Sequence, residues 1–269
     1  GIYSSLLALV LSENSLDYAQ VPALEIKRSL GITRGKSDKV DAKEIAHYAK
    51  RNTDKIALST LPELSLQQLK IVFAEREKTV AAIKTFERTK ENEMFLTKEV
   101  FNSVKAINNQ TVKHLKKQLV MLDEKIRTLI REDENLYGQQ QLLKSIPGIG
   151  DITSVYILMA TKGFTAFTSG RKFACYSGVA PFEHSSGTSI KGKTRVSHLA
   201  DKKMKTLLHM ASLTAIKYDP ELKDYYNRKK AEGKHTMLVL NNIKCKMVYR
   251  IFAVIQRKSN FVNLHKFAA

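Results

Sequence analysis

The sequence predicts a mainly α-helical protein with a short α/β part at its N-terminal end. Apolar residues recur at helical spacings over most of the chain, an unbroken seam of such residues runs between positions 112 and 129, and a Gly- and Ser-rich stretch at 178–197 interrupts the pattern. We expect three parts: residues 1–60, a long helical arm at 61–138, and a helical C-terminal domain at 139–269.

The composition points to a nucleic-acid partner. The chain has 45 Lys and Arg against 26 Asp and Glu, a net charge of +19, and this excess favours a polyanion. A membrane is the competing partner, but the longest apolar stretch, residues 2–11, is too short to span a bilayer. Two cysteines, Cys175 and Cys245, without CxxC spacing argue against a zinc site or disulfide framework and agree with a reducing cytoplasm.

Residues 1–36 form the predicted α/β piece. Helical spacing covers residues 3–12, residues 18–21 are compatible with a strand, and Pro22 is suited to open a second helix. Gly31 is suited to end that helix.

The next predicted helix begins with an acidic turn. Ser37 is a good N-cap, and Asp38 and Asp41 lie three residues apart on one helical face. Two carboxylates so placed can ligate Mg²⁺, which prefers oxygen ligands. Acids in a first helical turn also complement the helix dipole without binding anything. Taken alone, the motif favours the second interpretation.

Residues 62–135 predict long helices. An a/d-type seam alternates steps of three and four, with charged residues outside it. Two packings remain open: a helical hairpin that packs on itself, or a coiled coil between two copies. The seam consists of Val112, Leu115, Leu119, Leu122, Ile126 and Leu129.

A tight turn, Ile146-Pro-Gly-Ile-Gly150, separates two apolar runs and resembles a helix-hairpin-helix motif. Glycines in such a turn allow close approach of a phosphate, and the next helix offers free N–H groups. The motif therefore predicts sequence-independent DNA contacts by Pro147, Gly148 and Gly150. A turn between packed helices is the equally supported alternative.

The stretch from Pro181 to Ser197 predicts a loop or short β-hairpin with a nucleophile. Ser185 and Ser186 stand beside glycine, where a hydroxyl is accessible for attack. Glu183 and His184 are candidates for proton transfer. Basic residues follow that suit DNA contacts and stabilisation of a pentacovalent transition state; an ordinary surface loop is the alternative. These basic residues are Lys191, Lys193, Arg195, Lys202 and Lys203. Further helices are predicted at 201–217, 220–231 and 235–257.

In their order and spacing, these stretches resemble the insertion-sequence 110 family of transposases, which includes the Piv-like DNA invertases. The resemblance runs from Ile26-Lys-Arg-Ser29 and Gly35-Lys-Ser-Asp-Lys-Val-Asp-Ala42, through the helical arm and the Pro-Gly-Ile-Gly turn, to Tyr176-Ser-Gly-Val-Ala-Pro181, His184-Ser-Ser-Gly187 and Lys191-Gly-Lys193. Each motif is weak alone, whereas the ordered set is specific.

The resemblance implies a bacterial DNA transposase with two catalytic parts. The N-terminal part would be a RuvC-like, ribonuclease-H-type domain whose Asp-Glu-Asp-Asp set binds Mg²⁺, with Asp38 and Asp41 as the last two acids. Ser186, or Ser185 as the close alternative, would attack DNA and form a phosphoserine link.

The same resemblance implies partners and a location. The acidic domain of one protomer would meet the serine loop of another in a dimer or tetramer. The partners would be DNA at the element ends and the target, and a noncoding guide RNA. No membrane association is expected, and the location would be the bacterial cytoplasm and nucleoid.

The resemblance also implies a truncated N-terminal domain. Family members carry their first Asp on an opening strand, and their Glu precedes a Thr-Gly-x-Tyr-like sequence whose end Gly1-Ile-Tyr3 matches. The first Asp and the Glu would then lie outside the chain, so we expect this fragment to be inactive by itself. The competing hypotheses are a non-enzymatic nucleic-acid binding module and a metal-dependent nuclease that uses Asp38 and Asp41.

Overall fold

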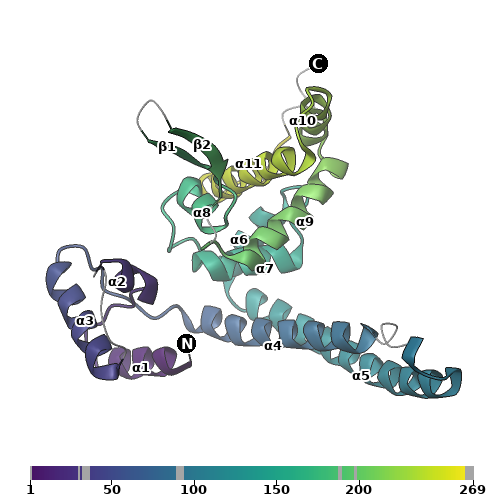
Figure 1. Cartoon of the computed structure of the whole chain (residues 1–269), viewed down its shortest axis with the longest axis horizontal. Helices are drawn as coiled ribbons and strands as arrows, with labels where there is room; N and C mark the ends of the chain where they lie inside the picture. Colours follow the sequence, from purple (N-terminus) through teal and green to yellow (C-terminus); the bar gives the residue numbers. More distant parts are fainter. Residues whose placement is uncertain are drawn as a thin grey trace. The chain divides into compact units, whose positions relative to one another are not determined.

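The structure is a computed structural model that describes residues 2–29, 31, 37–88, 94–186, 190–196 and 199–263, without the side chains of 2–3, 182–186 and 190–195. The chain divides into two compact units, Gly1–Glu63 and Leu64–Ala269. As predicted, helices dominate both units (Figure 1). In the described ranges, no helix is both long and apolar enough to cross a membrane.

Among its described residues, the first unit contains three helices, α1 (Ile2–Glu13), α2 (Ala23–Ser29) and α3 (Asp38–Arg51). The buried ring of Tyr48 anchors α3, and its hydroxyl donates a 2.7 Å hydrogen bond to the Glu25 carboxylate on α2. These contacts hold α2 and α3 together at the end of α3 opposite to its acidic first turn.

The strand considered for residues 18–21 is wrong, because this segment has no regular secondary structure. It is extended next to Ser59: the Ser59 N–H donates to the Tyr18 carbonyl at 2.8 Å, and the Gln20 N–H donates to Ser59 Oγ at 2.8 Å. One backbone bond and one side-chain bond do not make a ladder, so the β-propensity of Val21 and Tyr18 is overridden.

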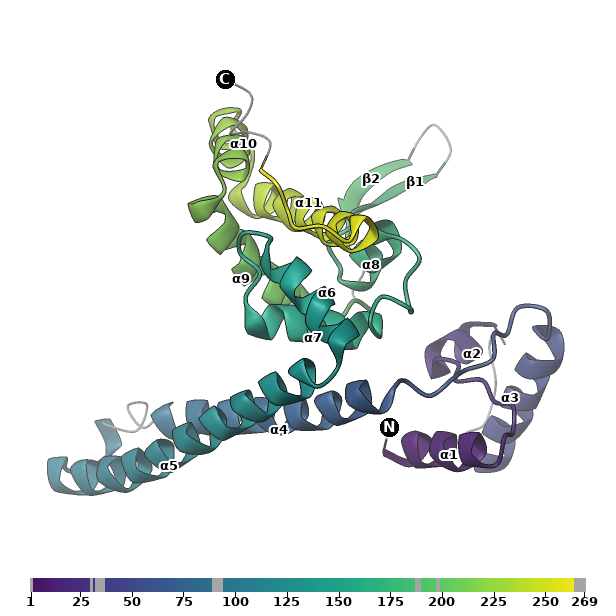
Figure 2. The same ribbon diagram turned by 180° about the vertical axis from the view of Figure 1, so that it is seen from behind.

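The second unit opens with an antiparallel helical hairpin, α4 (Leu64–Glu87) and α5 (Lys98–Arg131), whose helices lie side by side in both views (Figure 1 and Figure 2). The predicted seam of α5 is buried or half-buried throughout. An ion pair of 2.6 Å between Arg76 and Asp123 and one of 2.9 Å between Lys116 and Glu87 cross the hairpin. The self-packed hairpin is thus present in the monomer.

The helices after the hairpin build the main core. They are α6 (Glu134–Lys144), α7 (Asp151–Thr161), α8 (Gly170–Tyr176), α9 (Lys202–Tyr218), α10 (Pro220–Ala231) and α11 (Thr236–Arg257). Helix α11 contacts four of the others, α6, α8, α9 and α10. The base of the hairpin joins the same core through Leu69 and Ile130. Burial of these apolar side chains is the main stabilising contribution, about 25 cal/mol per Å².

Candidate active site

The two candidate serines lie in a β-hairpin between α8 and α9. Strand β1 (Phe182–Ser186) pairs antiparallel with β2 (Ile190–Arg195), so the hairpin alternative of the sequence analysis is the observed one. In the register, Ser185 is opposite Lys191 and Ser186 is opposite Ile190. The connecting residues 187–189 lie outside the described residues, as do the side chains of both strands.

The register separates the two serines. Because successive residues of a strand alternate between faces, Ser185 and Ser186 occupy opposite faces, and Ser185 shares the face of its partner Lys191. Lys193 follows the last regular pair, His184–Gly192, so the register does not assign it to a face. An irregularity between the Phe182 and His184 pairs interrupts the alternation before Arg195.

The root of the hairpin is fixed by the carboxylate of Asp201, the N-cap of α9. Asp201 accepts hydrogen bonds from the Tyr156 hydroxyl at 2.9 Å and the Tyr176 hydroxyl at 2.8 Å, and from the Met204 N–H at 2.9 Å. Its own N–H donates to the Tyr176 carbonyl at 2.9 Å. One side chain thus connects α7, α8 and α9 where the chain enters and leaves the hairpin.

This cluster also changes the acidity of both tyrosines. Burial raises the pKa of Tyr156 and of Tyr176, and the hydrogen bond to Asp201 raises each pKa further, because loss of a phenolic proton would place two negative charges together. The two hydroxyls therefore remain donors over the whole physiological range. A 310 Å³ pocket lies beside them, lined also by Lys70, Phe73 and Lys162.

A second contact holds the segment that leads into β1. The Asn241 side-chain amide on α11 donates to the Val179 carbonyl at 2.8 Å. Ser177 is fully buried and donates to the Phe173 carbonyl at 2.7 Å. Residues 176, 177 and 179 are consequently tied to α9, α8 and α11 just before the β-hairpin begins.

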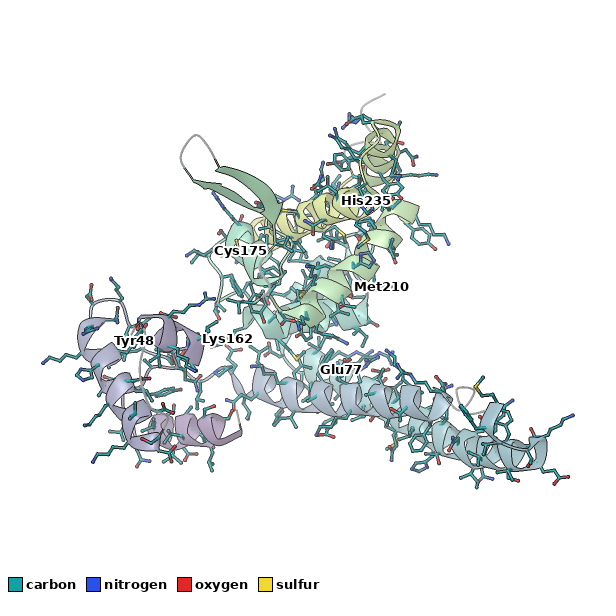
Figure 3. All side chains as sticks on the ribbon, viewed as in Figure 1. Tyr48, Glu77, Lys162, Cys175, Met210 and His235 are labelled. Atoms are coloured by element: carbon teal, nitrogen blue, oxygen red, sulfur yellow. The ribbon has the colours of Figure 1, made fainter. Side chains whose placement is uncertain are left out.

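The basic residues after the hairpin have different environments. Lys202 is exposed at the start of α9. Lys203 forms an ion pair with Glu77 of α4, which Figure 3 labels on the helical hairpin. Lys203 therefore connects α9 to α4 of the helical hairpin, an intramolecular role that the sequence did not indicate.

The turn between α6 and α7 differs in one respect from the sequence interpretation. Gly148 has φ +93°, and a Cβ at this position would lie 2.3 Å from the Ala211 carbonyl oxygen of α9. The side on which a Cβ would stand is therefore occupied by α9, and a contact of the Gly148 backbone with DNA stays a prediction. Gly150 caps α7 and has open space around it, Pro147 is half-buried, and Lys144 pairs with Asp151 at 2.6 Å.

Asp38 and Asp41 lie in the other compact unit, exposed in the first turn of α3. Ser37 caps this helix as predicted, with its hydroxyl accepting from the Val40 N–H at 3.3 Å. No ion pair occupies either carboxylate among the described residues, and no group of three or more His, Cys, Asp or Glu gathers there or elsewhere in the described part of the chain. The two acids can supply two oxygen ligands, but not a complete set.

Sequence reasoning missed the residues that hold the hairpin. The Asp201 cap was visible as an acid before an apolar-periodic run, but its tyrosine partners are 45 and 25 positions away. Asn241 gave no signal, since its contact with Val179 spans 62 positions.

Comparison with known proteins gives the class of this fold and site. Residues 140–227 match the family model described as Transposase IS116/IS110/IS902 family, and residues 1–92 match a second model, described as Transposase, of the DEDD type of IS110. Both matches lie within the transposase class. The chain belongs to the IS116/IS110/IS902 family of transposases.

Several relatives cover much of the chain. It is 29% identical over 236 residues to the pilin gene-inverting protein of Moraxella bovis, which is 87% of this chain and 70% of that protein. It is 28% identical over 236 residues to the protein of the same name from Moraxella lacunata, with the same coverage of both chains. An insertion element IS900 protein of 42 kDa from Mycobacterium paratuberculosis is 33% identical over 134 residues, 48% of this chain and 33% of that protein.

Proposed function

We propose that, when completed by the first Asp and the Glu expected to lie outside it, this chain cuts and rejoins DNA with a serine nucleophile at Ser186, or at Ser185 as the alternative. The observation that carries the proposal is the hairpin: two serines end one strand, and the facing strand carries Lys191 and Lys193. In a family of transposases, a serine hydroxyl on a strand that pairs with a basic strand has a direct use, because the substrate is a phosphodiester.

The proposed step is an exchange at phosphorus. The serine oxygen forms a bond to the phosphorus of one strand, its proton passes to a nearby base, and the bond to one deoxyribose oxygen breaks. A DNA hydroxyl then attacks the phosphoserine, which rejoins the strand and releases the serine. Lys191, Lys193 and Arg195 stabilise the added negative charge of the pentacovalent transition state, and Glu183 and His184 are the proton-transfer candidates.

In the N-terminal unit, Asp38 and Asp41 are the proposed magnesium ligands. Two exposed carboxylates one helical turn apart, free of ion pairs within the described residues, fit an ion that takes one or two carboxylates and completes its shell with water and phosphate. When bound, Mg²⁺ acts as a Lewis acid on a phosphoryl oxygen. The RuvC-like character of the N-terminal part and the domain bounds 1–60, 61–138 and 139–269 belong to the same proposal.

The remaining contacts serve nucleic-acid binding and assembly. Pro147, Gly148, Gly150 and the first N–H groups of α7 are proposed backbone contacts to DNA, and exposed Lys202 adds a charge. A guide RNA and the nucleoid as location are compatible with the charge of +19. Association into a dimer or tetramer, in which α5 of one copy meets another, is supported by its exposed apolar side chains, Val104, Ile107 and Met121.

The proposal is tested by trapping the covalent intermediate. The full-length parent protein, which carries the first Asp and the Glu expected outside this chain, is incubated with DNA that has element ends, candidate guide RNA and Mg²⁺, and a protein–DNA adduct that survives denaturation is sought. We expect the adduct to vanish in Ser186→Ala and to persist in Ser103→Ala, an exposed serine of α5 that serves as control. Asp41→Ala should reduce strand cleavage strongly. An adduct that survives in both Ser186→Ala and Ser185→Ala would exclude the serine mechanism.

Two alternative functions have their own outcomes in this experiment. Steeply salt-dependent binding without any strand cleavage indicates a nucleic-acid binding module, which the charge of +19 favours. Cleavage that needs Asp38 and Asp41 but leaves no adduct indicates a metal-dependent nuclease.

A further inference from the structure

A small aromatic pocket lies at the root of the serine hairpin. Its volume is 310 Å³, and its walls come from α4, α7 and α8. Phe73 of α4, Tyr156 and Met159 of α7, and Tyr176 of α8 line it with three rings and a thioether. Ligand pockets range from about 300 to 1,000 Å³, so this one accommodates a single small group. The pocket takes no part in the proposed serine chemistry.

The rings that line the pocket are held in place by the protein itself. Phe73 is buried and packs on Tyr156 with ring centroids 5.5 Å apart. Tyr176 stacks on Phe173 with centroids 5.8 Å apart, and both tyrosine hydroxyls donate to Asp201. Because their hydroxyls are engaged, the two tyrosines offer a ligand mainly their rings. Tyr176 is still 37% exposed, so a planar group can reach it.

Two lysines of the pocket wall lack an acidic partner. Lys70 of α4 and Lys162, which follows the last residue of α7 and is labelled in Figure 3, both line the pocket and are exposed. Within the described part of the chain, neither ammonium group forms an ion pair or a side-chain hydrogen bond. Glu77 of α4 is paired instead with Arg76 and Lys203. The pocket therefore combines aromatic walls with two cations that are available to a ligand.

A nucleotide has the features that match this combination. Every base has a flat face that stacks on aromatic side chains, and the phosphates on either side of it are attracted by ammonium groups. An apolar side chain from a second protein copy would fill the aromatic walls but would leave both lysines without a partner. A base can enter such a pocket only when it has left the stack of a duplex, where its neighbours cover both of its faces.

We propose that this pocket binds one unpaired nucleotide of the DNA strand on which the serine acts, with the base on the rings of Tyr156 and Tyr176 and the flanking phosphates at Lys70 and Lys162. The inference rests on the proposed function for the identity of the strand. Its location supports this, because Tyr176 precedes the start of β1 at Phe182 by six residues. A base held there fixes the register in which the strand meets the serines.

The test uses a short DNA that reports stacking. The 269-residue chain is titrated with the deoxytrinucleotide T–2-aminopurine–T, in EDTA so that no strand chemistry occurs. Stacking on an aromatic ring quenches the fluorescence of 2-aminopurine, so we expect saturable quenching. Ala74→Glu places an acid on the exposed wall of the pocket and should weaken binding by roughly tenfold or more. Ala81→Glu is the matched control.

The control makes the same change in net charge on the same helix. Ala81 is exposed, lies two helical turns beyond Ala74 and does not line the pocket. Its variant should weaken binding by less than about twofold, because salt screens a charge at that distance. Equal binding by the two variants would place the trinucleotide outside the pocket and overturn the proposal, as would quenching that does not saturate.

Lysine variants test the phosphate contacts. Lys70→Gln and Lys162→Gln should each reduce the slope of log K against log salt by about 0.7, the value for one phosphate of a single strand. Lys223→Gln, at an exposed position of α10, should leave the slope unchanged. A slope that neither pocket variant changes would overturn the proposal.

Two further outcomes separate this site from related possibilities. Saturable binding of the ribotrinucleotide U–2-aminopurine–U without binding of the deoxy form would identify RNA as the occupant and overturn the assignment to DNA. The adduct experiment is independent of these titrations. Absence of the serine adduct with intact trinucleotide binding removes the serine mechanism alone, and an adduct without binding in the pocket removes the pocket alone.

Discussion

Replacing Gly148 with alanine tests whether this glycine serves the packing of the C-terminal core. The new Cβ would lie 2.3 Å from the Ala211 carbonyl oxygen and 3.0 Å from the Ala215 nitrogen, so α9 would have to move by about 1 Å. Overpacking of this kind costs about 1–3 kcal/mol. The φ of +93° adds about 1–2 kcal/mol for a residue with a Cβ.

We therefore expect Gly148→Ala to lower the free energy of unfolding by about 2–5 kcal/mol. The assay is urea unfolding followed by circular dichroism, with Gly150→Ala as the matched control from the same turn. Gly150 has open space around it and no positive φ, so its variant should change stability by less than about 1 kcal/mol. Equal stability of the two variants would refute the reasoning and return Gly148 to the phosphate-binding interpretation.

Three further predictions concern charge. The raised pKa of Tyr156 and of Tyr176 favours the folded state below the ordinary tyrosine pKa of 10.0, so stability should fall as the pH rises above it, and should fall less in the double Phe variant. Arg250→Met leaves the buried carboxylate of Asp219 without its cation and should cost about 3–5 kcal/mol in urea unfolding. Lys202→Gln should reduce the slope of log K against log salt for duplex DNA by about one.

The tyrosine prediction has its own refuting outcome, and the Arg250 and Lys202 predictions each have a matched control. If both tyrosines ionise near the ordinary value in the folded protein, the contact with Asp201 is not formed. Lys246 lies 4.0 Å from Glu221 at the surface, so Lys246→Met should change the free energy of unfolding by less than about 1 kcal/mol. An equally small change in the free energy of unfolding for Arg250→Met would contradict the buried ion pair with Asp219. Lys203→Gln should change the salt slope less than Lys202→Gln, because Lys203 is paired with Glu77.

Local patterns predicted the helices well. The helices expected at 201–217, 220–231 and 235–257 are observed as α9, α10 and α11 within one residue at each end. These segments have capping residues and apolar periodicity, which act over a few positions. The seam of α5 is predictable for the same reason. The sequence left open whether this seam packs on a helix of the same chain, as it does on α4, or on a second copy.

Contacts between distant positions were not predictable. The approach of Gly148 to α9 joins positions 63 apart, and a glycine in a turn has the same sequence signature whether helix or phosphate occupies the space. The strand expected at 18–21 failed because strand formation depends on a partner strand, and the described partner there is Ser59 alone.

The most direct test of the central claim is the chemical identity of the protein–DNA link. The trapped adduct is digested with protease and nuclease, and the modified peptide is sequenced by mass spectrometry. The account predicts a nucleotide attached through phosphate to Ser186, or to Ser185, in the peptide that contains β1. A nucleotide on any other residue, or efficient strand transfer without a covalent link, would contradict it.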